Sequence, residues 1–456
     1  MVLQVLKYLL FFFQYMAIDT SPLSVYVMHP FWNKVVEFVP KWVAPNILTF
    51  GGFLLIVLDF LLLSYYDYSY YASSTRSYNE TAENPLNGYV EVVPQSLWYV
   101  IGVMLFVAYT LDGIDGKQAR RTQTSGPLGE LFDHGLDSYT VFFIPACLYS
   151  IFGRTDFSIS PLRIYYVMWN LLLNFYLSHW EKYNTGVLFL PWGYDFGMWT
   201  STAVFLWTGA KGTAWYKRYV FGSYTVANVF EWTIYLTGVA TNIPVACYNI
   251  YKSYNLRTGK MRSPFEAIRP LWSLLYIFII LSIWVHKSDR LPSYDLRVLF
   301  LLMGTVFSNV ACRLIVSQMS NQRCEGINSL TYPLLLCTVL SLTLPQYEPV
   351  ALYCLTALAV VAHAHYGCCV VTSSAVLSDC SLSGGPRALR LLCGELILVV
   401  YCSLTCIDTE IYLLTYPLLL CTVLSLTLPQ YEPVALYCLT AVSVVAHAHY
   451  GCCVVS

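Results

Sequence analysis

The sequence predicts an all-α fold: a polytopic membrane bundle of about ten spanning helices with an N-terminal interfacial helix. Of the 456 residues, 57% are hydrophobic and only 11% are charged, against roughly 25% charged residues in a soluble domain. Apolar runs of about 17 to 22 residues recur between polar loops, and each can cross a hydrocarbon core of ~30 Å as a helix. A β-barrel would instead show short segments of alternating polarity.

Charge, cysteine placement and the N-terminus exclude further classes of protein. The formal net charge is −1, so no nucleic-acid partner is expected. The sixteen cysteines fall mostly inside apolar C-terminal segments rather than in loops, which argues against a disulfide framework. The apolar N-terminus has no positive region before it and no small-residue cleavage site after it, so we do not interpret it as a signal peptide.

Residues 1–46 are the predicted N-terminal segment. Within it, residues 21–46 mix aromatic and aliphatic side chains with Lys34, Glu37 and Lys41, which is typical of a helix in the membrane interface. An amphipathic helix packed on the rest of the protein explains the pattern equally well. Pro45 marks the start of the first span, and Asn46 would be a helix cap or a polar ligand at its mouth.

The predicted spans cover residues 47–66, 97–111, 139–152, 162–177, 198–209, 229–248, 271–286 and 296–316. Lys117, Arg120 and Arg121 follow the second span, so the positive-inside rule places this end in the cytoplasm. The loop 67–96 would then be lumenal, and it holds the glycosylation sequon Asn79-Glu80-Thr81. Residues 178–196 are rich in aromatic and polar side chains, and we interpret them as a second wall of a site. The alternative is an aromatic belt in which Glu181 and Lys182 snorkel to the interface.

The C-terminal part contains a repeat. Residues 331–371 return at 415–455, with only Leu358 and Ala359 replaced, by Val442 and Ser443. Architectural repeats diverge far more than this. Our hypothesis is that two versions of one terminal exon are both retained, with unrelated sequence between them. The predicted organisation is therefore an N-terminal segment (1–46), a membrane domain (47–371) and an apparent duplicated segment (372–456).

The most polar stretch runs from Asp112 to Asp137 and lies between two spans, where charged groups are costly and usually functional. If the flanking helices continue beyond the membrane, Asp112 and Asp115 share one helix face, and Asp133 and Asp137 share another. The sequence TQTSGP between them favours a chain reversal that brings both faces together. Four converging carboxylates would repel one another unless they bind one or two hard divalent cations, Mg²⁺ or Mn²⁺.

Glycines 113, 116 and 129 lie beside these aspartates and leave room for a bulky ligand. Lys117 and Arg120 would meet its remaining negative charge, so the implied ligand is a diphosphate. One alternative is a loop in which these cations simply pair with the aspartates. Another is a membrane cation transporter, although acids clustered at a span boundary beside basic residues argue against ion passage.

The spacing of the block resembles the signature of the CDP-alcohol phosphotransferase family. Asp112-Gly113, Asp115-Gly116 and Ala119-Arg120 are followed after eight residues by Gly129, and then at intervals of three residues by Asp133 and Asp137. The resemblance extends from about residue 19 to residue 371. The strings YVMHPFWN, DGIDGKQARR and LGELFDHGLDS look like the eukaryotic ethanolaminephosphotransferase branch in particular.

The resemblance implies transfer of phosphoethanolamine from CDP-ethanolamine to diacylglycerol, giving phosphatidylethanolamine and CMP. The four aspartates would hold two divalent ions. His134 matches the general base of eukaryotic members, whereas bacterial relatives suggest Asp137. Glu181 would orient His134 or the headgroup. The residues that would contact the nucleotide are Asn46, Gly113, Gly116, Lys117, Arg120 and Gly129.

The family likeness also implies the setting of the enzyme. It predicts a homodimer in the endoplasmic reticulum or Golgi membrane, with its active site facing the cytoplasm. Diacylglycerol would enter sideways from the membrane, and the water-soluble CDP-alcohol would enter from the cytoplasm. A choline-type or dual-specificity transferase stays open, because it would share all the metal and nucleotide residues.

Overall fold

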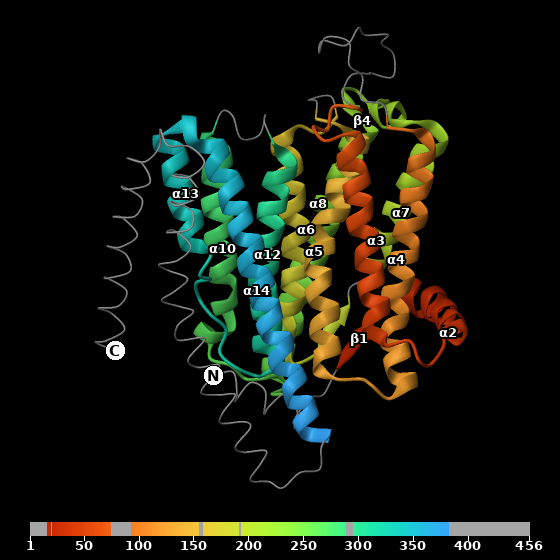
Figure 1. The fold of residues 1–456 in the computed structure, drawn as a ribbon, viewed down its shortest axis with the longest axis vertical. Coiled ribbons are helices and arrows are strands. Elements are labelled where there is room, and N and C mark those ends of the chain that lie inside the picture. The colour runs from red at the N-terminus through yellow and green to blue at the C-terminus, as the bar shows by residue number, and fades with distance from the viewer. Residues whose placement is uncertain are drawn as a thin grey trace. The chain divides into compact units, whose positions relative to one another are not determined.

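The computed structural model describes residues 16–19, 21–73, 93–154, 158–190, 193–288 and 295–382. The described chain is mostly helical (Figure 1). It divides into two compact units, one of Tyr8–Leu352 and one that combines Met1–Lys7 with the chain from Tyr353 onward. In the second unit, the described residues belong to helix α14 (Glu348–Leu382). The predicted glycosylation site at Asn79 and the second repeat copy at 415–455 lie outside the described residues.

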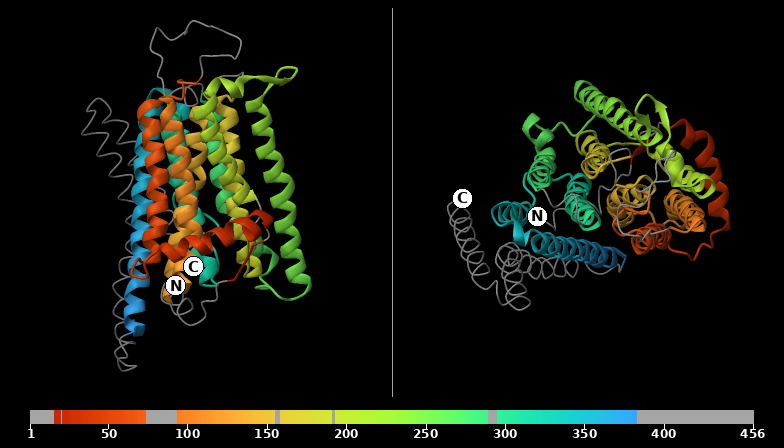
Figure 2. Two further views of the ribbon diagram at one scale, coloured as in Figure 1. Left: turned by 90° about the vertical axis from the view of Figure 1, so that its right-hand side faces the viewer. Right: turned by 90° about the horizontal axis from the view of Figure 1, so that it is seen from above.

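The first unit is a bundle of helices (Figures 1 and 2). Its larger helices are α3 (Pro45–Tyr66), α4 (Gln95–Thr122), α5 (Pro127–Phe152), α6 (Pro161–Thr185), α7 (Gly193–Lys211), α8 (Val226–Thr237), α9 (Ile243–Asn255), α10 (Pro264–Lys287), α12 (Leu296–Met319) and α13 (Thr331–Thr343).

Within the described ranges, six helices are long and apolar enough to cross a membrane. Five are α3, α4, α5, α10 and α12, and the sixth is the helical stretch Pro345–Val370. The sequence predicts about ten spans, whereas the described residues contain six helices of this kind. The predicted span at 162–177 falls in α6, which also carries a polar end, and the span at 198–209 falls in α7.

The predicted span at 229–248 contains an irregular turn. A π-helical turn, η3 (Gly238–Asn242), joins α8 directly to α9. At this turn Asn242 Nδ2 donates to Asn174 Oδ1 at 2.9 Å, and Asn170 Nδ2 donates to the carbonyl of Ile234 at 3.1 Å. Side chains that insert beside a helix ladder in this way are a common cause of π-turns.

Two short sheets depart from the all-α prediction. Strand β1 (Ala17–Asp19) pairs in parallel with β2 (Leu188–Leu190), and β3 (Tyr219–Phe221) pairs antiparallel with β4 (Tyr224–Thr225). Strands of two or three residues are too short to show the alternating pattern by which strands are predicted. The first sheet ties the N-terminal segment to the chain just after α6.

The N-terminal segment forms a π-helical turn, η1 (Ser24–Met28), and helix α2 (His29–Phe38). Helix α2 runs across the direction of the bundle helices (Figure 2). One face of α2 buries Trp32 and Val36, while Phe38 is 87% exposed. Arg121 Nη1 at the end of α4 donates to the carbonyls of Val36 at 2.7 Å and Val39 at 2.6 Å. These bonds hold α2 against α4.

Helices α4 and α5 both extend beyond the predicted spans, as the spacing of the aspartates required. Helix α4 continues to Thr122, and Gln123 ends it in the left-handed conformation with φ 60°. Helix α5 starts at Pro127 after Gly126 in extended conformation, which suits the fixed φ of a proline in the first helical turn. The predicted chain reversal at TQTSGP is thus confirmed.

Candidate active site

The structure brings the four aspartates of the acidic block together. Carboxylate oxygens of Asp112, Asp115 and Asp133 lie within 4.8 Å of one another, and so do ligand atoms of Asp133, His134 and Asp137. Asp133 belongs to both groups, so the four acids form one continuous cluster between α4 and α5. Oxygen donors this close together are the ligand set that hard divalent cations prefer.

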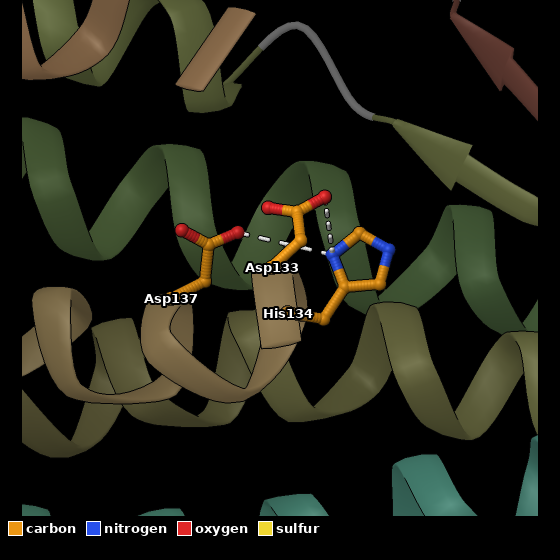
Figure 3. A group of neighbouring side chains, drawn as sticks. All are labelled: Asp133, His134 and Asp137. Carbon is orange, nitrogen blue, oxygen red and sulfur yellow. Dashed lines mark ion pairs between the residues drawn. The ribbon is translucent and has the colours of Figure 1, made fainter. Parts of the chain in front are cut away.

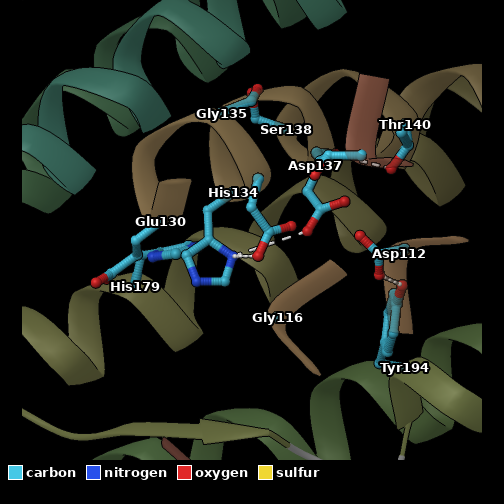
Figure 4. A network of polar contacts seen from close by, with 12 residues as sticks. Asp112, Gly116, Glu130, His134, Gly135, Asp137, Ser138, Thr140, His179 and Tyr194 are labelled. Carbon is cyan, nitrogen blue, oxygen red and sulfur yellow. Dashed lines mark hydrogen bonds and ion pairs between the residues drawn. The ribbon is translucent and has the colours of Figure 1, made fainter. Parts of the chain in front are cut away.

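Two hydroxyl groups from other helices orient this cluster. Thr49 Oγ1 on α3 donates to Asp115 Oδ2 at 2.5 Å. The Tyr194 hydroxyl on α7 donates to Asp112 Oδ2 at 2.8 Å (Figure 4). The backbone N–H of Gly116 also donates to Asp115, through its other oxygen Oδ1. Outer partners of this kind commonly orient metal ligands.

His134 lies beside two of the acids. Its Nδ1 is 3.9 Å from Asp133 Oδ2 and 3.8 Å from Asp137 Oδ2 (Figure 3). On its other side, the ring of His179 from α6 makes an edge contact, with ring centroids 5.2 Å apart (Figure 4). The imidazole of His134 is therefore buried between the acidic cluster and a second histidine.

The basic residues of the block have partners other than the aspartates. Lys117 Nζ donates to Asn33 Oδ1 at 2.8 Å and lies 3.3 Å from His29 Nδ1. Arg121 bonds backbone carbonyls of the N-terminal segment. Within the described part of the chain, His134 is the only basic group in an ion pair with the four aspartates. No ion pair in the described part of the chain joins Lys117, Arg120 or Arg121 to these aspartates, so the contacts do not support a loop held by such salt bridges.

The three glycines differ in their surroundings. A Cβ atom at Gly113 would overlap the indole ring of Trp32, so this glycine allows α2 to approach α4 closely. At Gly116 the nearest atom would be Arg120 Nη1 at 3.6 Å, and at Gly129 it would be Asn46 Oδ1 at 3.7 Å. A Cβ atom at Gly116 or Gly129 would thus make only ordinary van der Waals contact with Arg120 or Asn46, two of the predicted nucleotide contacts.

The residues of this site fall in a region that matches a known protein family. A profile of the CDP-alcohol phosphatidyltransferase family matches residues 42–189, which include all four aspartates. Ethanolaminephosphotransferase 1 of Homo sapiens is 44% identical over 364 residues, which cover 79% of this chain and 88% of that protein. The chain belongs to the CDP-alcohol phosphatidyltransferase family.

Two further relatives differ in their sequence identity to this chain. Ethanolaminephosphotransferase 1 of Mus musculus is 43% identical over 365 residues, covering 79% of this chain and 88% of that protein. Choline/ethanolaminephosphotransferase 1 of Saccharomyces cerevisiae is 30% identical over 326 residues, covering 66% and 76%. The sequence is thus more similar to these ethanolamine-named relatives than to this dual-named one.

A pocket adjoins the acidic cluster of this family member. Asp112, Asp137 and Tyr194 form its polar part, whereas Gly52, Ile56 and Met198 are among the residues that line its apolar part. The lining comes from α3, α4, α5 and α7. Polar and apolar side chains therefore meet directly beside the acidic cluster.

Glu181 forms its side-chain hydrogen bond with α9 rather than with His134. It is buried and accepts a hydrogen bond from Asn249 Nδ2 of α9 at 2.7 Å. Burial raises the pKa of Glu181, which lies beyond the predicted span 162–177, to about 7. Lys182 is also buried and pairs with Glu130 of α5. Both side chains are inside the protein, so the alternative that they snorkel to an interface is wrong.

Three residues near the cluster escaped the sequence prediction: Thr49, His179 and Tyr194. Thr49 follows Asn46 by one helical turn, a weak signal on its own. His179 and Tyr194 lie in residues 178–196, the stretch interpreted as a second wall, and they contact His134 and Asp112. The stretch itself could be recognised from its composition, but its contacting residues could not.

Proposed function

We propose that this protein transfers phosphoethanolamine from CDP-ethanolamine to the 3-hydroxyl of diacylglycerol, producing phosphatidylethanolamine and CMP. The observation that carries the proposal is the acidic cluster with His134 beside a pocket that has an apolar part. The 44% identity to a human ethanolaminephosphotransferase supports the same activity. The choline-type alternative has weaker support, because the cholinephosphotransferase of Saccharomyces cerevisiae is 29% identical.

The residues present fit divalent metal ions. The ligand atoms form two groups that share Asp133, one of three carboxylates and one of two carboxylates with His134, each within 4.8 Å. The four carboxylates suit two ions of Mg²⁺ or Mn²⁺. Asp112 and Asp115 would hold one ion, and Asp137 would hold the other. Bound ions would neutralise charge on the diphosphate and on the departing CMP.

The protein's own groups then direct the transfer. His134 takes the proton as the O–H bond of the diacylglycerol hydroxyl breaks, with Asp137 as the alternative base. The hydroxyl oxygen bonds to the phosphorus of phosphoethanolamine, and the bond from this phosphorus to the CMP oxygen breaks. The nucleotide lies against Gly113, Gly116, Lys117, Arg120, Gly129 and Asn46. Glu181 receives the headgroup.

The apolar part of the pocket receives the lipid acceptor from within the membrane. In this proposal the bundle has about ten spans, α2 lies in the interface, and the site faces the cytoplasm of an endoplasmic reticulum or Golgi membrane. The exposed side chains of Phe38 and Trp42, at 87% and 84%, support an interfacial α2. The working form is a homodimer, which crosslinking in native membranes would test.

The membrane domain of the proposal ends at residue 371, and residues 372–456 hold a second version of its ending at 415–455, with unrelated sequence before it. The near identity of 331–371 and 415–455 supports this hypothesis. Sequencing of full-length transcripts tests it, because a dominant message that holds both copies would show the duplicated ending to be genuine.

The test of the activity is a headgroup competition. Protein reconstituted with diacylglycerol and Mg²⁺ or Mn²⁺ should release CMP faster from CDP-ethanolamine than from CDP-choline. Equal rates would remove the assigned specificity. Asp133→Ala should abolish CMP release. If the protein were a cation carrier, the wild type would release no CMP, and the variant would instead block ion flux.

The role of His134 is tested in the same assay. His134→Ala should slow the chemical step roughly 10²- to 10⁴-fold if this residue is the general base. A loss below tenfold would assign the proton to Asp137 or to water.

A further inference from the structure

A line of buried polar side chains connects α12 to His134 through α6. The side-chain amide of Gln318 on α12 donates to Nδ1 of His179 on α6, with 3.1 Å between the two nitrogens. The ring of His179 meets the ring of His134 at 65° between their planes. All three side chains are buried, so water does not compete for these contacts.

The contact between the two histidines helps to fix the register of α5 against α6. Glu130 and His134 lie one turn apart on α5, and their partners Lys182 and His179 lie one turn apart on α6. The ion pair and the ring contact therefore fix the same faces of α5 and α6 against each other. Figure 4 shows His134 between His179 and Asp137.

His179 is itself held in place. Its Nδ1 is hydrogen-bonded to the side-chain amide of Gln318. The ring of Phe175, one turn earlier on α6, packs on it with centroids 4.8 Å apart. A ring fixed by a hydrogen bond and an aromatic neighbour is a rigid support for the imidazole beside it.

The support matters because of what the other side of His134 faces. Its Nδ1 lies 3.8 Å and 3.9 Å from carboxylate oxygens of Asp137 and Asp133. Rotation of the imidazole would move this nitrogen away from the cluster, and displacement of a reacting group by about 1 Å can cost 10²-fold in rate.

We propose that His179 is a positioning residue, which holds the imidazole of His134 with Nδ1 towards the acceptor hydroxyl, and that Gln318 in turn holds His179. The proposal rests on the proposed function, in which His134 takes the proton. In this proposal, the aromatic and polar stretch 178–196 contributes to the chemical step through His179.

The test uses the full chain in vesicles that contain diacylglycerol. His179→Phe keeps a ring of similar size and removes the nitrogen that Gln318 bonds. We expect kcat to fall about 10- to 100-fold, with KM for CDP-ethanolamine unchanged within about twofold. Gln318→Leu should lower kcat in the same direction by a smaller factor. The matched control is His286→Phe, which removes a histidine paired with Tyr166 outside the site and should leave kcat unchanged.

A double-mutant comparison separates positioning from general damage. If His179 acts through His134, His179→Phe should have no further effect on kcat in the His134→Ala background. An equal loss in both backgrounds would overturn the proposal, because that loss would reflect the scaffold. An unchanged kcat, or a change in KM alone, would overturn it too.

The controls also separate this proposal from the proposed function. If the wild type releases no CMP from CDP-ethanolamine, the assigned activity fails, and the same comparison is made with CDP-choline. If the wild type is active but His134→Ala lowers kcat less than tenfold, His134 is not the base and His179 is not its positioning residue. An active wild type with a sensitive His134 and an insensitive His179 refutes the positioning role alone.

Discussion

At the residue scale, two hydroxyl groups from other helices hold carboxylates of the acidic cluster in place. Thr49 and Tyr194 each bond one oxygen of a clustered aspartate, Asp115 and Asp112 respectively. Loss of such an outer partner lets the carboxylate rotate, so the metal loses a ligand held in position. Removing either hydroxyl should therefore raise the metal concentration that is needed for half-maximal activity.

Thr49→Val tests this dependence, since it replaces the hydroxyl by a methyl group of similar size. The half-saturating concentration of Mg²⁺ or Mn²⁺ should rise about 10- to 100-fold, because Asp115 loses its bond at 2.5 Å. Metal titration of CMP release measures it. The control is Thr110→Val, because Thr110 bonds only the carbonyl of Phe106 in its own helix. Equal metal dependence in Thr49→Val and the wild type would show that Thr49 does not orient a ligand.

Glu181 gives a prediction about pH. Since burial raises its pKa to about 7, the carboxylate fraction rises about tenfold between pH 6 and pH 8. If this carboxylate binds the ethanolammonium headgroup, KM for CDP-ethanolamine should fall across that range by a similar factor. Glu181→Gln should have a KM that no longer varies with pH, while KM for diacylglycerol stays the same. A variant that keeps the pH dependence of the wild type would remove Glu181 from the headgroup site.

At the element scale, the close approach of α2 and α4 sets one wall of the site. The ring of Trp32 packs directly against Gly113, where a Cβ atom would overlap it. The same ring packs on Tyr109, with ring centroids 5.4 Å apart. Lys117 and Arg121 bond the same N-terminal segment. The helix that carries Asp112 and Asp115 is therefore fixed by α2 along its last two turns.

Gly113→Ala should displace α2 and lower both turnover and thermal stability, because the added methyl overlaps the ring of Trp32. A change of this kind in a packed interface typically costs about 1–3 kcal/mol. A smaller side chain should make room, so the double variant Gly113→Ala with Trp32→Leu should regain part of the turnover. Turnover and melting temperature of the single and double variants measure it.

Two other glycines serve as controls for this prediction. Gly126→Ala has nothing within 4 Å of its added methyl and should be neutral. Gly116→Ala should keep the stability and raise KM for the nucleotide, since only Arg120 lies near. If Trp32→Leu rescues nothing, the glycine at 113 is needed for ligand contact rather than for helix packing.

The same elements show what the sequence can and cannot predict. The spacing of Asp112, Asp115, Asp133 and Asp137 predicts their convergence, because helical period and a short reversal leave few other arrangements. The contact of His179 with His134 depends on the register of α5 against α6. That register is set by packing over the whole bundle and has no local signal. The short strands β1 and β2 escaped prediction for the same reason, since each is stabilised only by its distant partner.

At the scale of the whole molecule, the clustered acids and every residue assigned to the proposed reaction lie between Asn46 and Gln318. All of them belong to the first compact unit, Tyr8–Leu352. Beyond residue 371, residues 415–455 repeat a segment that the chain already has at 331–371.

A chain that ends at Val371 should therefore release CMP at the same rate per folded molecule as the full chain. The comparison is made in vesicles, with the folded fraction measured by melting of the detergent-solubilised proteins. A chain that ends at Ser320 is the control, because it lacks α13, whose Leu334 and Cys337 are buried, and it should give little folded protein. If the Val371 chain folds normally but loses tenfold in turnover, the terminal segment contributes to the working enzyme, and the membrane domain must extend beyond residue 371.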